Sequence, residues 1–216
     1  MNNAYSLIID ITAFILFAFL HSFLASFKVK SILAKRNGSA MAFYRLTYNI
    51  IFLWLCWCLY EYLPRPDAEL FELKYPWDII ILIPQFLALA AVIWTFKFFS
   101  LTEFLGIAQI KRWKDGTFTG SWEEGMQDES NTKDILDERL TLKIEGPYKV
   151  VRHPLYLFSM IFLILRPTMD LFYLVFLIFL IAYFYSGSFY EERKLVSAFG
   201  DQYRKYQESV PRLFPI

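Results

Sequence analysis

The feature that most constrains this chain is a set of five long apolar runs separated by charged segments. They cover approximately Tyr5–Ala25, Tyr44–Leu63, Ile79–Phe99, Pro154–Leu165 and Leu171–Phe189. A helix needs about 20 mostly apolar residues to cross a hydrocarbon core of about 30 Å. Five such runs in 216 residues leave too little polar surface for a soluble globule. We therefore predict an all-α integral membrane protein with about five transmembrane helices, the fourth of them short.

The placement of lysine and arginine predicts the orientation of these helices. Basic residues gather in segments 28–45, 111–152 and 193–212, whereas the opposite side carries only Arg65, Lys74 and Arg166. Basic residues concentrate on the cytoplasmic side of membrane proteins. The N-terminus is therefore expected outside and the C-terminus in the cytoplasm. The first run is expected to be a retained helix rather than a signal peptide, because Asp10 interrupts it and no basic residue precedes it.

Composition argues against several classes of function. The 22 Lys and Arg nearly balance the 21 Asp and Glu, so the net charge of +1 offers no electrostatic case for binding nucleic acid. The 23 phenylalanines argue against intrinsic disorder. With two cysteines and two histidines, the sequence predicts neither a disulfide scaffold nor a metal site. Nothing in the sequence indicates an oligomeric state.

Two polar segments lie on the predicted cytoplasmic side. The stretch from 115 to 140 is rich in charged and small polar residues, and it is either a mobile lid or an insertion without a role. Residues Tyr190–Tyr206 are expected to form a separate amphipathic helix, with a possible break at Gly200. The tail Val210–Ile216 is too apolar to be free, and we expect it to pack back on the body as a pocket wall.

The densest signal for a site lies between Gly146 and Tyr156. Gly-Pro marks a turn, and Pro154 suits the first turn of a helix. Arg152 and His153 would then stand at the N-terminal end of that helix, where free N–H groups also favour an anion. Tyr156 follows one turn later on the face of His153.

A second signal follows the fifth apolar run, at Glu191 and Glu192. A tight hairpin between the last two runs would bring these carboxylates back beside His153. Opposed cations and carboxylates would suit a zwitterionic ligand. The alternatives are that Arg152 is a membrane-surface anchor, that His153 caps its helix, and that the glutamates form a solvated helix end.

These motifs, in order, resemble the isoprenylcysteine carboxyl methyltransferase superfamily of integral-membrane enzymes. The resemblance covers residues 146–216 through Gly-Pro-Tyr-x-x-x-Arg-His-Pro-x-Tyr, Glu-Glu, Tyr-x-x-Tyr and Val-Pro-Arg-Leu-x-Pro. The N-terminal half is similar to the branch that contains methanethiol S-methyltransferases and NnrU-type proteins. The motifs there are His21-Ser22-x-x-Ala-Ser, Tyr44-Arg45-x-x-Tyr48-Asn49 and Phe104-Leu-Gly-Ile-x-Gln109.

The resemblance implies S-adenosyl-L-methionine as cofactor, bound at the cytoplasmic face of a bacterial inner (plasma) membrane. Arg152 and His153 would bind its carboxylate, and Glu191 and Glu192 its ammonium group or a ribose hydroxyl. The side chains implied around the adenine are Tyr148, Tyr156, Tyr203 and the tail with Arg212. The chain would be one domain over 1–216, with helices in 1–100, a cytoplasmic polar segment in 101–145 and the cofactor-binding hairpin and tail in 146–216.

Three polar residues in or beside apolar helices are candidates for the acceptor side of the reaction. They are His21, Asn49 and Gln109, with His21 as the base that takes the acceptor's proton. Hydrogen bonding between helices is the alternative role for all three.

The resemblance implies an S-adenosylmethionine-dependent methyltransferase that acts on a small thiol or another lipophilic acceptor in the bilayer. Two alternatives use the same scaffold for carboxyl methylation of a prenylcysteine or N-methylation of a lipid head group. A third is a non-catalytic membrane protein of NnrU type.

Overall fold

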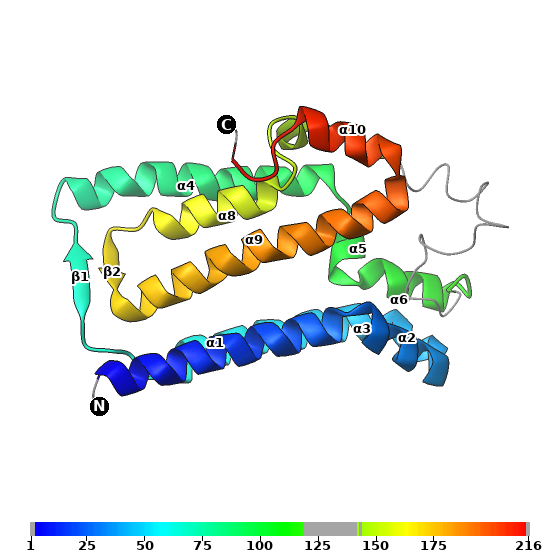
Figure 1. Ribbon diagram of the computed structural model, residues 1–216, viewed down its shortest axis with the longest axis horizontal. Coiled ribbons are helices and arrows are strands. Elements are labelled where there is room, and N and C mark those ends of the chain that lie inside the picture. Colours follow the sequence, from blue (N-terminus) through cyan, green and yellow to red (C-terminus); the bar gives the residue numbers. More distant parts are fainter. Residues whose placement is uncertain (1–2, 119–141, 143, 215–216) are drawn as a thin grey trace. The chain divides into compact units, whose positions relative to one another are not determined.

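The computed structural model describes residues 3–118, 142 and 144–214 (Figure 1). Most of the stretch predicted to be a lid or an insertion, 119–140, lies outside these residues. Contacts group the described residues into two compact units. Unit 1 holds those within Met1–Leu7, Arg65–Phe99 and Leu140–Ile216, and unit 2 holds those within Ile8–Pro64 and Ser100–Arg139. The single domain expected from the sequence stays a prediction.

Unit 1 is built around three helices that pack side by side (Figure 1). Helix α4 (Trp77–Thr95) lies against α8 (Pro154–Ile164), which lies against α9 (Leu171–Phe199). In this apolar packing the Gln85 side chain donates to the Phe162 carbonyl at 3.2 Å, because an unpaired amide in hydrocarbon is costly. The 3₁₀ helix η2 (Phe96–Phe98) extends α4, η3 (Gly146–Lys149) precedes α8, and α10 (Asp201–Ser209) follows α9.

Two short strands, which the sequence analysis did not predict, close the far end of unit 1. Strand β1 (Glu69–Glu72) pairs antiparallel with β2 (Thr168–Asp170), directly before α9. Asp170 then caps α9 by accepting from the Tyr173 N–H at 2.8 Å. The turn between α8 and α9 is therefore held by backbone pairing as well as by its short length.

Unit 2 contains most of α1 (Asn3–Ala25), with α2 (Phe27–Arg36), η1 (Gly38–Ala40), α3 (Met41–Tyr62), α5 (Leu101–Leu105) and α6 (Ile107–Lys114). The Tyr44 and Tyr48 hydroxyls donate from α3 to carbonyls near the end of α1. Gly106 separates α5 from α6 with φ +93°, and a Cβ there would lie 2.6 Å from the Leu46 nitrogen. Only glycine allows both that conformation and that approach to α3.

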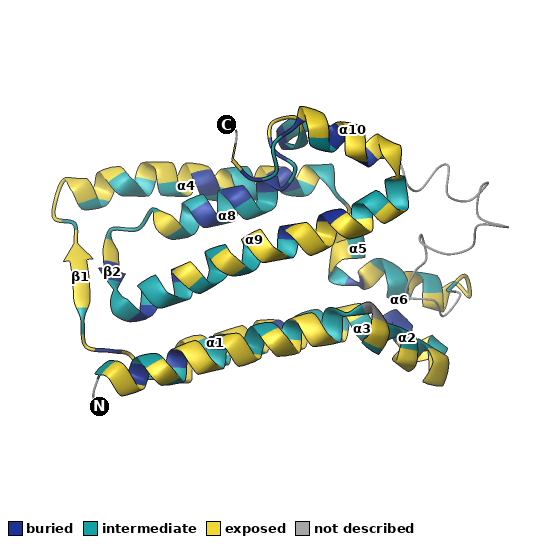
Figure 2. Ribbon diagram, in the orientation of Figure 1, coloured by how far each residue is buried: buried dark blue, intermediate teal, exposed yellow. Residues whose placement is uncertain are grey.

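Within the described residues, four helices are long and apolar enough to cross a membrane: Asn3–Ala25, Gly38–Tyr62, Trp77–Phe98 and Leu171–Phe199. Large apolar side chains stand exposed along them, as the exposed stretches in Figure 2 show. This pattern suits lipid as the surrounding solvent. The fifth predicted span, α8, has 11 residues and reaches about 16 Å, half of a hydrocarbon core. The prediction of an all-α integral membrane protein is confirmed.

The expectation of a separate helix over Tyr190–Tyr206 is wrong in its boundaries. Helix α9 continues without interruption through Phe199, because each added residue extends an existing hydrogen-bonded helix. The chain turns at Gly200, whose φ of +56° suits glycine, and α10 begins at Asp201. The apolar side chains of this segment pack together around the corner, with Leu195 and Phe199 against buried Tyr203 and Tyr206.

Candidate functional site

The turn before α8 depends on Gly146. Its φ is +54°, and a Cβ at this position would lie 2.3 Å from the Phe98 ring. Pro147 follows as the second residue of η3, and Pro154 opens α8 as its first residue. The local sequence therefore brings Arg152 and His153 to the N-terminal end of α8, as predicted.

The C-terminal tail holds this turn in place. The Arg152 N–H donates to the Pro211 carbonyl at 2.9 Å, and the His153 N–H donates to the Arg212 carbonyl at 3.0 Å. Val210 and Leu213 are buried beneath. The prediction that the tail packs back on the body is confirmed for residues 210–213. Its carbonyls accept hydrogen bonds from N–H groups at the start of α8 that have no partner within the helix.

Arg152 and Glu192 form a buried ion pair with two hydrogen bonds. Arg152 Nε lies 2.7 Å from Glu192 Oε1, and Nη2 lies 3.2 Å from Oε2. The two side chains are only 7% and 3% exposed. The remaining Arg152 nitrogen, Nη1, donates to the carbonyls of Gln207 and Val210. Such a network compensates the cost of burying both charges.

Glu192 is the centre of this network. Besides Arg152, it accepts from Gln207 Nε2 at 2.9 Å and pairs with Arg212 Nη2 at 3.1 Å. His153 Nε2 lies 3.2 Å from its Oε1. One carboxylate thus links α8, α9, α10 and the tail.

Glu191 belongs to a more exposed edge of the same network. It accepts from the Tyr156 hydroxyl at 2.9 Å and lies 3.5 Å from His153 Nδ1, and its side chain is 48% exposed. The His153 and Tyr156 rings are stacked 5.3 Å apart, and Phe184 continues the stack at 5.0 Å from Tyr156. Tyr156 lies on the face of His153, as predicted.

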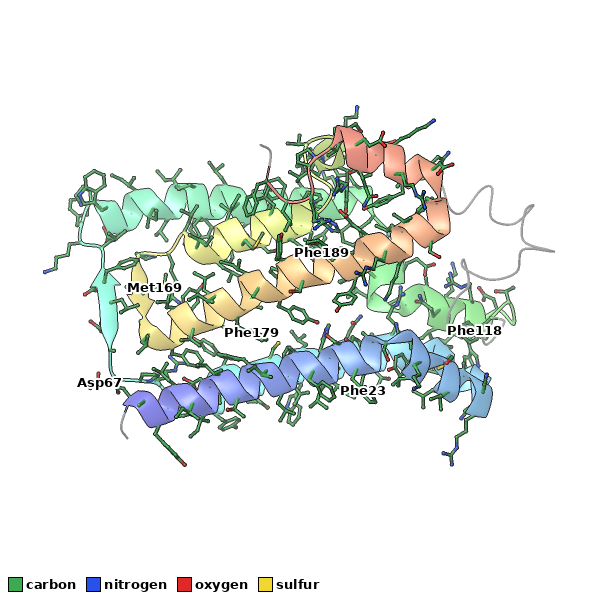
Figure 3. All side chains as sticks on the ribbon, viewed as in Figure 1. Phe23, Asp67, Phe118, Met169, Phe179 and Phe189 are labelled. Atoms are coloured by element: carbon green, nitrogen blue, oxygen red, sulfur yellow. The ribbon has the colours of Figure 1, made fainter. Side chains whose placement is uncertain are left out.

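Arg212 lines a cavity beside the network. Its guanidinium lies 3.6 Å from the centre of the Phe189 ring, and Figure 3 places Phe189 on α9 near the C-terminal segment. Among the described residues, no hydrogen-bond partner reaches its buried Nε. The cavity measures about 320 Å³ and is lined by Phe189, Glu192, Arg193, Val196, Gln207 and Arg212. This volume is at the small end of the range for ligand pockets.

The two remaining predicted cofactor residues, Tyr148 and Tyr203, lie next to the network. Burial and the Glu191 carboxylate raise the pKa of Tyr148 to about 12. Tyr203 is 1% exposed and packs edge-on against Tyr206, and burial raises its pKa. Tyr206 donates its hydroxyl proton to the Tyr148 carbonyl at 2.6 Å, and burial raises its pKa to about 12. These phenols therefore stay neutral at physiological pH and add no charge beside the network.

The predicted cations and carboxylates form one network rather than two clusters that face each other. Two arginines balance two glutamates, so the network is neutral when His153 is neutral. His153 occupies the N-cap position of α8, but its side chain makes no capping hydrogen bond. In the parts of the chain that the structure describes, no group of three His, Cys, Asp or Glu side chains could hold a metal ion.

Two of the three acceptor-side candidates lie in unit 2 beside one pocket. The Asn49 amide donates to the Phe104 and Leu105 carbonyls at the end of α5. Gln109 Nε2 donates to the Glu103 carboxylate at 3.0 Å. Asn49 thus has a structural contact of the kind that the alternative reading predicted, and its role in catalysis stays a prediction.

His21, the third candidate, lies in an aromatic environment. Its ring is 4.7 Å from the Phe52 ring, 5.2 Å from Tyr48 and 6.0 Å from Phe17, measured between centroids. It does not line the pocket beside Asn49 and Gln109. Its role as a base stays a prediction.

Sequence reasoning missed several residues that shape these sites. Gln207 and Phe189 complete the network in unit 1, and Arg45, Glu103 and Arg112 border the pocket in unit 2. Arg45 belongs to the Tyr44-Arg45-x-x-Tyr48-Asn49 motif, and its charge also contributes to the predicted orientation of the helices. No local pattern marks Gln207, because its contacts come from residues that are distant in the chain.

Comparison with known proteins finds similarity over about a third of the chain. It is 40% identical over 68 residues to a methanethiol S-methyltransferase of Pseudomonas deceptionensis, covering 32% of this chain and 26% of the relative. Methanethiol S-methyltransferase 1 of Bradyrhizobium diazoefficiens is also 40% identical over 68 residues, with 32% and 24% covered. A methanethiol S-methyltransferase of a Pseudomonas species is 36% identical over 80 residues, with 37% and 31% covered.

The matched segments thus span about a quarter to a third of the length of these relatives. No family profile matches the chain, and no solved structure matches it significantly. The matches support the predicted methanethiol S-methyltransferase branch. The wider isoprenylcysteine methyltransferase resemblance stays a prediction.

Proposed function

We propose that this protein is a membrane-embedded methyltransferase that transfers the methyl group of S-adenosylmethionine to a small thiol. The observation that carries the proposal is the similarity of a third of the chain to three methanethiol S-methyltransferases. The neutral network of arginines and carboxylates beside a cavity adds a site of matching chemistry. We also propose the membrane orientation predicted from the basic loops. In that orientation the network lies at the cytoplasmic face of a bacterial inner membrane.

The residues of the network fit S-adenosylmethionine in charge and in polarity. The buried Arg212 Nε without a partner among the described residues is a donor for a carboxylate. Glu191, with its half-exposed carboxylate, is an acceptor for an ammonium group or a hydroxyl. Phe189, which lines the cavity, offers an aromatic side chain for a sulfonium or an adenine. When bound, the cofactor would supply an electrophilic methyl group.

In this proposal Arg152 and Glu192 position the other groups. Their mutual bonds, and those of Glu192 to Gln207 and Arg212, fix α8, α9 and the tail before any ligand arrives. Such preorganisation lowers the cost of ordering a site on binding. His153 orients the Glu191 carboxylate through Nδ1 and contacts Glu192 through Nε2.

The acceptor thiol must lose its proton before it attacks a methyl carbon, because the thiolate is the nucleophile. We propose His21 as the base that takes this proton. Its neighbours are aromatic rings, an apolar environment that suits a small thiol. Gln109 and Asn49 are proposed on the acceptor side, where the sequence predicted them.

The test is binding of S-adenosylhomocysteine to the detergent-purified protein by calorimetry, followed by labelled-methyl transfer to methanethiol. Arg212→Gln and Glu191→Gln should each weaken binding about tenfold, because each removes one charge-assisted hydrogen bond. Arg204→Gln and Glu208→Gln are matched controls, since both side chains are exposed on α10 and lie outside the cavity. They should bind as the wild type does.

Two results would count against the proposal. Absence of S-adenosylhomocysteine binding by a folded wild-type sample would remove the methyltransferase and favour the non-catalytic alternative. Binding with transfer to a prenylcysteine or a lipid amine, but to no small thiol, would retain the cofactor site and reject the acceptor. His21→Ala should lower the transfer rate far more than S-adenosylhomocysteine affinity, and equal losses would point to a structural role.

A further inference from the structure

Helix α2 (Phe27–Arg36) connects two membrane-spanning helices, and the proposed methyl transfer uses none of its residues. Only Ser26 separates α2 from the end of α1, and the next apolar span begins at Gly38 (Figure 1). Helix α1 has 23 residues and is about 35 Å long, enough to cross a hydrocarbon core of about 30 Å. Both ends of α2 are therefore tied to the surface of the bilayer.

Packing against the protein buries little of α2. None of its described side chains is fully buried, and Ile32 and Leu33 stand exposed (Figure 2). The helix has 10 residues, whereas isolated helices shorter than about 12–15 residues are only marginally stable in water. Most short helices are stabilised by burying an apolar face. The apolar side chains that would stabilise α2 in this way are available to a partner.

Basic groups accompany these apolar side chains on one side of α2. Four exposed residues fall within about 100° of its circumference, since each residue turns the helix by about 100°. These four, the basic face, are Lys28, Ile32, Lys35 and Arg36. Lys30 is half-buried, lies on the opposite side of the helix and is not part of this face. Residues 11–60 contain no Asp or Glu, so α2 and the segments that flank it in the chain carry positive charge alone.

Helix α10 shows how a helix of similar length is built when it covers protein. Its apolar residues Tyr203 and Tyr206 are buried. Its four exposed charged residues balance in sign, and they are Asp201, Arg204, Lys205 and Glu208. Helix α2 has the opposite arrangement, with exposed aliphatic side chains and charges of one sign. Such a helix suits the boundary between hydrocarbon and negatively charged head groups.

We propose that α2 is an interfacial helix that docks on the head groups of anionic phospholipids. Lys28, Lys35 and Arg36 contact the lipid phosphates, and Ile32 enters the boundary between head groups and acyl chains. Long basic side chains allow this arrangement, because their methylene stems lie along apolar surface while the charge stays in water. The partner is therefore lipid of net negative charge rather than zwitterionic lipid. The proposal does not depend on methyl transfer.

Hydrogen–deuterium exchange of the full-length protein in lipid nanodiscs tests the proposal. One set of nanodiscs contains phosphatidylcholine, and the other contains phosphatidylglycerol with the same acyl chains. We expect the amides of α2 to exchange at least about tenfold more slowly in phosphatidylglycerol, since each basic residue near an anionic surface contributes about fivefold to binding. Amides of α10 should exchange equally in both lipids. Raising NaCl from about 0.05 M to about 0.5 M should reduce the ratio for α2, because salt screens the attraction.

Two variants test the assigned contacts of the basic face. Lys28→Gln combined with Lys35→Gln should lower the exchange ratio between the lipids at least about fivefold, and glutamine keeps the helix propensity of lysine. Arg204→Gln combined with Lys205→Gln removes two exposed cations from α10 and is the matched control. It should leave the ratio for α2 within about twofold.

Ile32→Ser tests the apolar contact separately. Isoleucine and serine have similar helix propensities, so the substitution removes mainly the apolar group. We expect exchange of α2 in phosphatidylglycerol to become about fivefold faster, because part of the side chain would no longer be shielded from water. An unchanged rate would overturn the insertion of Ile32.

The remaining outcomes decide whether anionic lipid is the partner. A ratio that falls in the α2 variant and not in the α10 variant supports the proposal. Equal exchange of α2 in the two lipids, with the transmembrane helices still protected, would overturn it. An equal fall in both variants would also overturn it, in favour of diffuse attraction between the whole protein and the membrane. Failure of the methyltransferase assay leaves these measurements unaffected.

Discussion

The charged groups of unit 1 and those of unit 2 are organised in opposite ways. In unit 1, Arg152 and Glu192 are almost fully buried, and Glu192 has four partners. In unit 2, the Arg112–Glu103 pair is partly exposed, at 23% and 41%, and both residues line a pocket. The first arrangement holds segments of the chain together. The second lies at the wall of a cavity.

The sharpest way to break this contrast is Glu192→Gln. The substitution leaves Arg152 buried without its counter-ion, so we expect a loss of about 3–5 kcal/mol in the free energy of unfolding. Chemical unfolding in mixed detergent micelles measures this loss, with Glu208→Gln as the exposed control. A loss of less than about 1 kcal/mol would show that Glu192 does not organise the network.

Gly146→Ala tests whether the turn before α8 positions the network. A positive φ costs a non-glycine residue about 1–2 kcal/mol, and the clash with Phe98 adds to that cost. We expect a total loss of about 2–4 kcal/mol in the free energy of unfolding. Phe98→Leu should recover the steric part in the double variant.

The control for this substitution is Gly187→Ala. Gly187 lies within α9, and a Cβ there would contact nothing within 4 Å. Alanine should therefore be neutral or stabilise by up to about 1 kcal/mol. Equal destabilisation by both substitutions would argue against a special role for the turn.

Tyr206→Phe removes one hydrogen bond below the network. The Tyr148 carbonyl would lose its donor, and we expect a loss of about 1 kcal/mol in the free energy of unfolding. Tyr190→Phe, at a largely exposed position, should have no measurable effect in the same unfolding assay. A wild-type value for Tyr206→Phe would mean that water replaces the lost donor.

Glu103→Gln is the counterpart of Glu192→Gln in unit 2. Because its ion pair is partly exposed, the expected loss is about 0.5 kcal/mol. The same unfolding assay gives the comparison directly. Similar losses for both substitutions would contradict the contrast between a buried network and an open pocket.

The smallest expected effect is the dependence of the free energy of unfolding on alkaline pH. Tyr148 and Tyr206 have pKa values of about 12 in the folded protein, above the ordinary value of about 10. Their contribution to stability is complete below pH 10 and is lost as the pH rises from 10 through 12, because the unfolded chain ionises first. Absorbance of tyrosinate should show these two groups titrating late, and Tyr148→Phe should remove one of them.

Much of the fold could be predicted because it follows from local chemistry. The apolar runs predicted α1, α3, α4, α8 and α9 to within a few residues at most ends, since hydrocarbon requires long runs of apolar residues with internal hydrogen bonds. The end of α9 was missed because Tyr190–Phe199 resembles an interfacial helix in composition. The two short strands have four and three residues, which is too short for an alternation of apolar and polar residues to mark them.

The sequence predicts which residues belong to the candidate site better than it predicts how they contact one another. Six of the eight predicted cofactor residues join one network, since the hairpin brings the two motifs together. From the sequence, the cations and the glutamates are expected to bind a ligand between them. The structure pairs them directly, and Gln207 enters through α10, which reaches Glu192 only because Gly200 turns the chain.

The membrane class of this protein, the turn at Gly146 and the packing of its apolar tail could be inferred from the residues alone. Each inference uses the transfer free energy of a short segment or one backbone conformation, and none of them requires knowing which distant residues make contact. Which charges neutralise each other depends instead on the folded arrangement. Arg152 and Glu192 lie 40 positions apart in the chain, and Coulomb energies depend on distances of a few ångströms that no local pattern sets.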